Sequence, residues 1–185
     1  ALLTALYAYN AVLRERRSKV EGITHPYLNV GRIDGGSNTN VVPGKVTLKL
    51  DRRMIPEENA ADVEAEVRAL IERAVTTHDP RVKVDVKRLL LAQALQPQSG
   101  NAALVEAIQR HAGEVFGATP PVVGTPLYTD VRLYGAAGVP AVIYGAGPRT
   151  VLESNAKRAD EHLVLDDLRR ATKVVARTLA DVLSG

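Results

Sequence analysis

Residues 35–54 constrain this chain more than any other part of its sequence. A loop rich in glycine and asparagine, which favours a turn, leads into an alternation of polar and apolar side chains that is typical of a β-strand. Successive side chains of a strand face opposite ways, so Asp51 and Arg53 are predicted to share one face while Arg52 points to the other. One arginine can therefore face a ligand, and its planar guanidinium suits a carboxylate.

The loop before this strand can contribute to the same contact. Asn38 and Asn40 carry side-chain amides that can donate to or accept from a bound molecule. The plainer interpretation is a surface hairpin with a solvated pair of arginines. The residues of this segment leave both interpretations open.

Composition excludes several classes of protein. The chain has 185 residues, of which 45% are hydrophobic, so it is long enough to fold around a core. A net charge of +3 and an aromatic content of 4% argue against nucleic-acid binding. The absence of cysteine excludes disulfides, thiolate metal sites and a cysteine nucleophile. No apolar run approaches the roughly 20 residues of a membrane helix, and we expect a cytoplasmic protein without membrane contact.

Periodicity and turn residues predict a mixed α/β chain, of the α+β kind. Over residues 1–87 the predicted order is helix, strand, strand, helix, strand, which indicates a ferredoxin-like βαββαβ unit without its first strand. Residue 1 already lies in a helical pattern and is not methionine, so we expect a fragment of a longer protein. Helices are predicted over 1–17, 56–74, 101–116 and from Asp166 onward, and strands over 26–33, 45–54, 81–87 and 139–145.

The composition changes around residues 95–100, where Gln-Pro-Gln-Ser-Gly is typical of a linker. This predicts two domains, 1–96 and 97–185. The second half contains helices and one buried strand, which cannot close a core by themselves because the sheet edges lack partners.

Several motifs in this order resemble the M20 family of zinc metallohydrolases, which includes succinyl-diaminopimelate desuccinylases, acetylornithine deacetylases, aminoacylases and carboxypeptidases. The resemblance lies in residues 35–57, 128–132, 138–147, 155–162 and 166–168. It implies that residues 1–96 are the lid, or dimerisation, domain and residues 97–185 the C-terminal portion of the zinc-peptidase-like catalytic domain.

The resemblance also implies a function for the complete protein. M20 enzymes use two divalent metal ions, expected here to be zinc, to hydrolyse an amide bond in an N-acyl amino acid, a small peptide or a related carboxylate substrate. They form homodimers through the lid. The metal ligands and the general base of the family lie mostly before the lid, so we expect this chain alone to hold no metal and to be inactive.

Four substrate-binding residues are implied by the matching motifs. Asn40 and Arg53 match the lid asparagine and arginine that reach the substrate, with the arginine binding its carboxylate. Thr129 and Asp130 match a loop that forms a wall of the active site, although a turn or helix-capping role explains them equally well.

Lys157 stands where the resemblance places a metal-binding histidine. A protonated ammonium has no lone pair and cannot coordinate a metal. A lost or altered second metal site, a deliberate substitution and a local shift to His162 are the three explanations. The other histidines, His25, His78 and His111, show no helical zinc motif, and His111 is placed among the polar positions of its helix.

Two further functions remain open. The chain can be a non-catalytic binding or dimerisation module that kept the lid and lost the metal centre, for which Lys157 is the main evidence. It can also be a small regulatory domain that binds an amino acid through its ferredoxin-like half. Residues 145–148 predict a phosphate loop only weakly, because a proline and no lysine follows the glycines.

Overall fold

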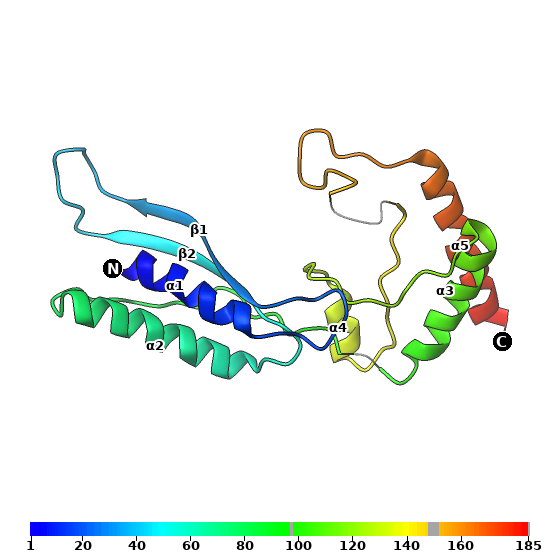
Figure 1. Ribbon diagram of the computed structural model, residues 1–185, viewed down its shortest axis with the longest axis horizontal. Coiled ribbons are helices and arrows are strands. Elements are labelled where there is room, and N and C mark those ends of the chain that lie inside the picture. Colours follow the sequence, from blue (N-terminus) through cyan, green and yellow to red (C-terminus); the bar gives the residue numbers. More distant parts are fainter. Residues whose placement is uncertain (97, 148–151, 185) are drawn as a thin grey trace. The chain divides into compact units, whose positions relative to one another are not determined.

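The computed structural model describes residues 1–96, 98–147 and 152–184, which form two compact units (Figure 1). The first unit comprises Ala1–Ala94 and Val123–Pro126, and the second comprises Leu95–Val122 and the described residues from Leu127 onward. Pro97 of the predicted linker and Pro148 of the weak phosphate-loop motif lie outside the described residues. The elements are α1 (Leu2–Glu15), β1 (Tyr27–Gly35), β2 (Val46–Arg53), α2 (Ala60–His78), α3 (Asn101–Phe116), α4 (Val131–Ala136) and α5 (Leu165–Ser184).

The first unit is built on an antiparallel hairpin of β1 and β2, with α1 and α2 beside it (Figure 1). Tyr27 pairs with Arg53 at one end of the hairpin, and Gly35 pairs with Val46 at the other. The predicted helix-strand-strand-helix order is therefore confirmed. The mixed α/β class predicted from the sequence is confirmed as well.

The core of this unit lies between the hairpin and its helices. Leu6, Tyr9 and Leu13 are three and four residues apart, so they line one face of α1, and all three are buried. They pack with Leu28 of β1 and Ile71 of α2. Burial of each such side chain contributes about 1.5–3 kcal/mol of stability.

Asn10 fixes α1 against β1 through two hydrogen bonds. Its Nδ2 donates to the carbonyl oxygen of Leu28 at 2.7 Å, and the backbone nitrogen of Leu28 donates to Asn10 Oδ1 at 2.8 Å. One amide side chain thus satisfies both backbone polar groups of Leu28. Because an unpaired backbone group in the interior is costly, Asn10 acts here as a neighbouring strand would.

Arg52 lies at the centre of a polar network beneath the hairpin. Its side chain is 9% exposed, and its Nη2 donates to Glu58 Oε1 at 2.6 Å. The same carboxylate accepts from Arg16 at 3.1 Å, and Arg16 also donates to Glu66 at 2.9 Å. The guanidinium of Arg16 lowers the pKa of Glu66. The network ties the end of α1 to β2 and to α2.

The predicted strand over 81–87 is wrong. No strand is assigned there, and the described residues contain a sheet of β1 and β2 alone. Val86 packs against the core, which explains part of the alternation, but its carbonyl oxygen accepts from Arg68 of α2 at 2.7 Å. Val82 and Val84 are exposed. Alternation indicated a segment with one partly buried side chain and gave no information about a pairing partner.

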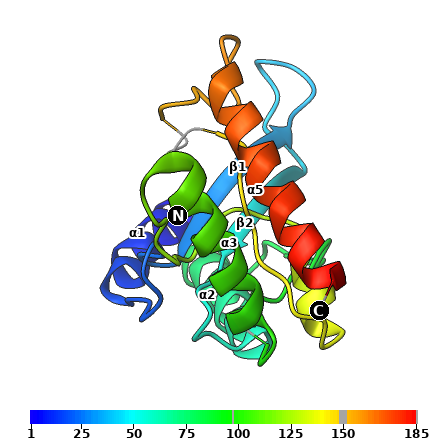
Figure 2. The ribbon, with the colours of Figure 1, turned by 90° about the vertical axis from the view of Figure 1, so that its right-hand side faces the viewer.

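In the second unit α3 and α5 lie side by side (Figure 2). Alanines make up half of the buried positions in the two helices, and a histidine is also among them. α3 extends over the predicted residues 101–116. Gly117 caps its C-terminal end, and its φ of +76° favours glycine. The buried positions are Ala107, His111 and Ala112 on α3 and Ala171, Val174 and Thr178 on α5.

The predicted buried strand over 139–145 is also wrong. The segment is not assigned as a strand, and Val139 and Ile143 are exposed. Asn101 Nδ2 donates to the carbonyl oxygen of Ala141 at 3.1 Å, and the Ala141 nitrogen donates to Asn101 Oδ1 at 3.0 Å. An asparagine again satisfies both backbone groups of one residue, and the described residues of the second unit contain no strand that could extend the pairing.

None of the helices in the described part of the chain combines the length and the apolar character needed to cross a membrane.

We predict that Asn10→Ala lowers the free energy of unfolding by about 2 kcal/mol, because both backbone groups of Leu28 lose their partner. Urea denaturation followed by circular dichroism measures this value. Asn29→Ala is the control. It alters an exposed residue of β1, next to Leu28, and is expected to change stability by less than about 0.5 kcal/mol. Equal losses in the two variants would contradict the role given to Asn10.

Candidate functional site

Arg53 lies at the end of β2 with one side of its guanidinium occupied. Its Nε donates to Asp51 Oδ2 at 2.8 Å, so the two side chains share one face, as predicted. The carboxylate of Asp51 raises the pKa of Arg53. The side chain is 37% exposed, and in the described part of the chain its terminal Nη1 and Nη2 groups have no hydrogen-bond partner. Two parallel donors are thus available to a carboxylate.

A second arginine on the hairpin provides a comparison. Arg32 of β1 donates to Asp34 through Nε at 2.7 Å and through Nη2 at 3.0 Å. This bidentate pair uses both oxygens of the carboxylate. Arg53, by contrast, is held at Nε alone, which fixes its plane and leaves the terminal edge open.

Asn40 and Arg53 lie at opposite ends of the hairpin. Asn40 belongs to the exposed loop that joins β1 to β2, whereas Arg53 is the last residue of β2 (Figure 1). A strand rises about 3.3 Å per residue, so the eight residues of β2 separate its ends by roughly 20 Å. A single copy of the hairpin therefore does not bring these two side chains to one small ligand.

Thr129 and Asp130 belong to the second unit, at the start of α4. Thr129 Oγ1 accepts from the backbone nitrogen of Val131 at 3.0 Å, the geometry of a turn stabilised by a hydroxyl. Asp130 is the N-cap residue of α4, and its exposed side chain makes no capping hydrogen bond. The turn role of Thr129 is thus visible in the structure, and substrate contact by either residue stays a prediction.

Lys157 lies in a tight turn with its side chain exposed. Its φ of +65° is in the left-handed region, and its backbone nitrogen donates to Glu161 Oε2 at 2.7 Å. The neighbouring His162 is exposed, and its Nδ1 lies 3.0 Å from the carbonyl oxygen of Asp160. The carboxylate of Glu161 is therefore engaged by the loop itself.

The described residues do not fit a metal ion on their own. No group of three histidine, aspartate or glutamate side chains comes together in residues 1–96, 98–147 and 152–184. Glu161 and His162 both contact the backbone of their own loop, and Lys157 offers an ammonium group. Binding and positioning of a ligand are the chemistry that these side chains can supply.

The prediction that His111 lies among the polar positions of its helix is wrong. It is buried between α3 and α5, and its Nε2 lies 2.6 Å from Asp181 Oδ2. His111 and then Arg110 lower the pKa of Asp181. The position one turn before His111 is Ala107, also buried, and this spacing was the available signal that the histidine faces the core.

The first part of the chain is similar to a known family of domains. The M20_dimer family model, described as a peptidase dimerisation domain, matches residues 1–78. Residues 1–78 are thus similar to a peptidase dimerisation domain of the M20 family. The recognition of the M20 family from the motifs is therefore confirmed, and the match covers α1, the hairpin and α2.

Curated relatives of this chain include hydrolases of amide bonds. It is 27% identical over 145 residues to a succinyl-diaminopimelate desuccinylase of Magnetococcus marinus, covering 78% of this chain and 35% of the relative. It is 26% identical over 176 residues to an acetylornithine deacetylase of Myxococcus xanthus, covering 94% of this chain and 43% of the relative. The chain thus spans less than half the length of these relatives.

Solved structures show the same fold. An M20 family metallo-carboxypeptidase from Sulfolobus solfataricus superposes with a TM-score of 0.58 at 19% identity, covering 94% of this chain and 41% of the other. Aminopeptidase PepT from Bacillus cereus gives a TM-score of 0.57 at 21% identity, covering 98% of this chain and 45% of the other. The similarity extends over both units and not over the dimerisation domain alone.

We predict that Lys157→His increases the amount of metal bound by the complete protein, because an imidazole supplies the lone pair that the ammonium lacks. Zinc measured by mass spectrometry after dialysis gives the stoichiometry. Arg158→His places the same group one residue away and is the control, for which no increase is expected. Equal metal content in the unsubstituted protein and Lys157→His would contradict the placement of Lys157 at a ligand position.

Proposed function

We propose that this chain is the lid and the C-terminal part of the catalytic domain of an M20 metallohydrolase that cleaves an amide bond in an N-acyl amino acid, a small peptide or a related carboxylate. The proposal keeps the two predicted domains, 1–96 and 97–185. Support comes from the match of residues 1–78 to the dimerisation domain and from relatives named as a desuccinylase and a deacetylase. A homodimer formed through the lid and a cytoplasmic location belong to the same proposal.

The role proposed for this chain is to bind the substrate. The observation that carries it is the geometry of Arg53, whose Nε is held by Asp51 while both terminal nitrogens remain available. A guanidinium fixed in this way loses little conformational entropy when it binds a carboxylate. Asp51 is thus a positioning residue, and Arg53 contacts the carboxylate.

Asn40, Thr129 and Asp130 are proposed as further contacts to the substrate. Because Asn40 lies at the far end of the hairpin from Arg53, the proposal assigns Asn40 and Arg53 of one copy to separate contacts. The two zinc ions proposed for the complete protein would be held by residues other than those described, so binding and orientation are the steps assigned to this chain.

A second candidate function is a non-catalytic binding or dimerisation module. The exposed ammonium of Lys157 at the position of a family metal ligand, together with the lack of a three-residue metal cluster in the described chain, favours it. Hydrolysis of N-acyl amino acids by the polypeptide translated from the complete gene separates the two candidates. Metal-dependent turnover supports the enzyme, and ligand binding without turnover supports the module.

In the enzyme, Arg53→Ala is predicted to raise the KM for an N-acyl amino acid by about 10- to 100-fold, because a charge-assisted bidentate contact contributes about 1.5–3 kcal/mol. Arg53→Lys should recover part of the loss, since a lysine supplies the charge without the planar pair of donors. Initial-rate kinetics measures KM and kcat separately.

Arg32→Ala is the matched control for this experiment. Arg32 is paired to Asp34, two residues away on β1, whereas Arg53 lies on β2 of the same hairpin. We expect its KM to equal that of the unsubstituted protein. An unchanged KM in Arg53→Ala, or equal effects in the two variants, would exclude Arg53 as the carboxylate contact.

A further inference from the structure

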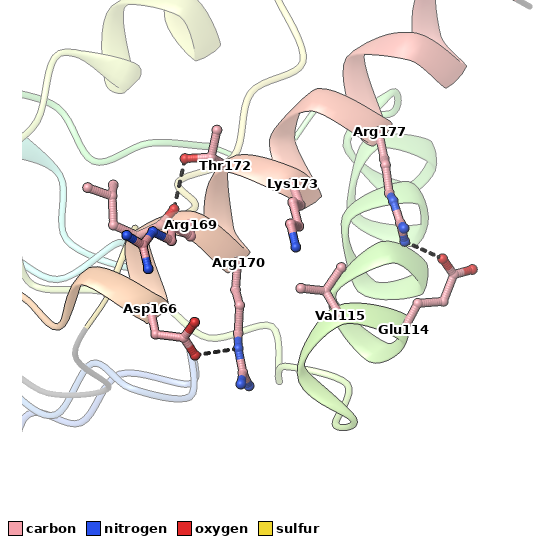
Figure 3. Close-up of a pocket in the computed structure, with 9 residues that line it drawn as sticks. Glu114, Val115, Asp166, Arg169, Arg170, Thr172, Lys173 and Arg177 are labelled. Carbon is pink, nitrogen blue, oxygen red and sulfur yellow. Dashed lines mark hydrogen bonds and ion pairs between the residues drawn. The ribbon is translucent and has the colours of Figure 1, made fainter.

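An open groove in the second unit, with a volume of about 870 Å³, lies between the end of α3 and residues 166–177 of α5 (Figure 3). Four of its lining side chains are cations and two are carboxylates, so positive charge is in excess. The charged residues that line it are Arg169, Arg170, Lys173 and Arg177, with Asp166 and Glu114. No function is assigned to it by the M20 similarity or by the proposed role of Arg53.

Two of these cations are held in place by their own partners. Arg170 Nε donates to Asp166 at 2.8 Å, and its guanidinium lies 5.9 Å from the ring centroid of Phe116. Arg177 crosses from α5 to α3 and donates to Glu114 at 2.9 Å. Both guanidinium groups are therefore oriented before any ligand binds, which lowers the entropic cost of binding.

The other two cations, Arg169 and Lys173, have no carboxylate partner among the described residues. Figure 3 shows the Lys173 side chain between those of Arg170 and Arg177. Positions 169, 173 and 177 follow one another at a spacing of four, and like charges at this spacing on a helix repel each other. An anion in the groove would relieve this repulsion, whereas the two carboxylates present are already paired.

The chemistry of the groove favours a phosphate group. Guanidinium groups are planar donors that match the oxygens of a phosphate, and an ammonium adds a compact positive charge. The volume is in the range of sites for small molecules. The low aromatic content of 4% supplies few stacking surfaces for a nucleic-acid strand.

We propose that this groove binds a small molecule carrying a phosphate or pyrophosphate group, with Lys173 and Arg169 as the unpaired contacts and Arg170 and Arg177 as the oriented ones. The proposal does not depend on hydrolytic activity, because all the residues involved belong to the second unit of this chain. Its failure would leave the role of Arg53 untouched.

Isothermal titration calorimetry of the 185-residue chain with pyrophosphate at low ionic strength tests the proposal. We expect one saturable site whose affinity falls as sodium chloride is added. Lys173→Gln and Arg169→Gln should each weaken binding by about tenfold or more. Both side chains are exposed, and circular dichroism confirms that the helices of each variant remain folded.

Two variants make the test specific. Lys83→Gln removes an exposed lysine of the other unit and should leave pyrophosphate affinity unchanged. Asp166→Asn removes a negative charge from the groove and should tighten binding severalfold, the opposite sign to Lys173→Gln, because the change in charge outweighs the lost orientation of Arg170. Titrations with orthophosphate and with a nucleoside triphosphate distinguish a site for the free ion from a site for a larger phosphorylated molecule.

Absence of saturable pyrophosphate binding would overturn the proposal. Equal weakening in Lys173→Gln and Lys83→Gln would do the same, since it would show a general effect of net charge.

Discussion

The alternation of side chains along β2 gives two adjacent arginines different roles. Arg52 points into the first unit, where Glu58 binds it and where Arg16 and Glu66 extend the network to α1 and α2. Arg53 points to the other face and is held only at Nε by Asp51. The same strand thus anchors the helices that support the hairpin and presents a guanidinium to solvent. The network thus adds a polar attachment between the hairpin and the helices to that provided by the apolar core and by Asn10.

The features of the fold that follow from local periodicity could be predicted from the sequence. The shared face of Asp51 and Arg53 depends only on the two-residue repeat of a strand, and α3 depends only on apolar spacing. The strands expected over 81–87 and 139–145 failed for one reason. A hydrophobic pattern does not report what the backbone pairs with, and without a pairing partner Val84 and Ile143 remain exposed. In the structure Arg68 and Asn101 supply hydrogen bonds that a neighbouring strand would otherwise make.

At the candidate sites, too, the sequence did not predict which distant residues come together. Asn40 and Arg53 are 13 residues apart in the sequence, yet the hairpin between them places them at opposite ends. The phosphate groove was not predicted, because Glu114 and the cations of α5 meet only when α3 packs against α5. The burial of His111 against Asp181 arises from the same packing. The family resemblance supplied the position of Lys157, and the structure adds that its backbone is held by Glu161.

The division of roles between the two arginines is tested most directly by the free energies of unfolding of Arg52→Ala and Arg53→Ala in this chain, measured by urea denaturation. Removing Arg52 leaves Glu58 buried with one partner fewer, which is expected to cost about 3 kcal/mol or more. Removing the half-exposed Arg53 should cost less than about 1 kcal/mol, as for exposed ion pairs. Equal losses in the two variants, or a larger loss for Arg53→Ala, would contradict the account.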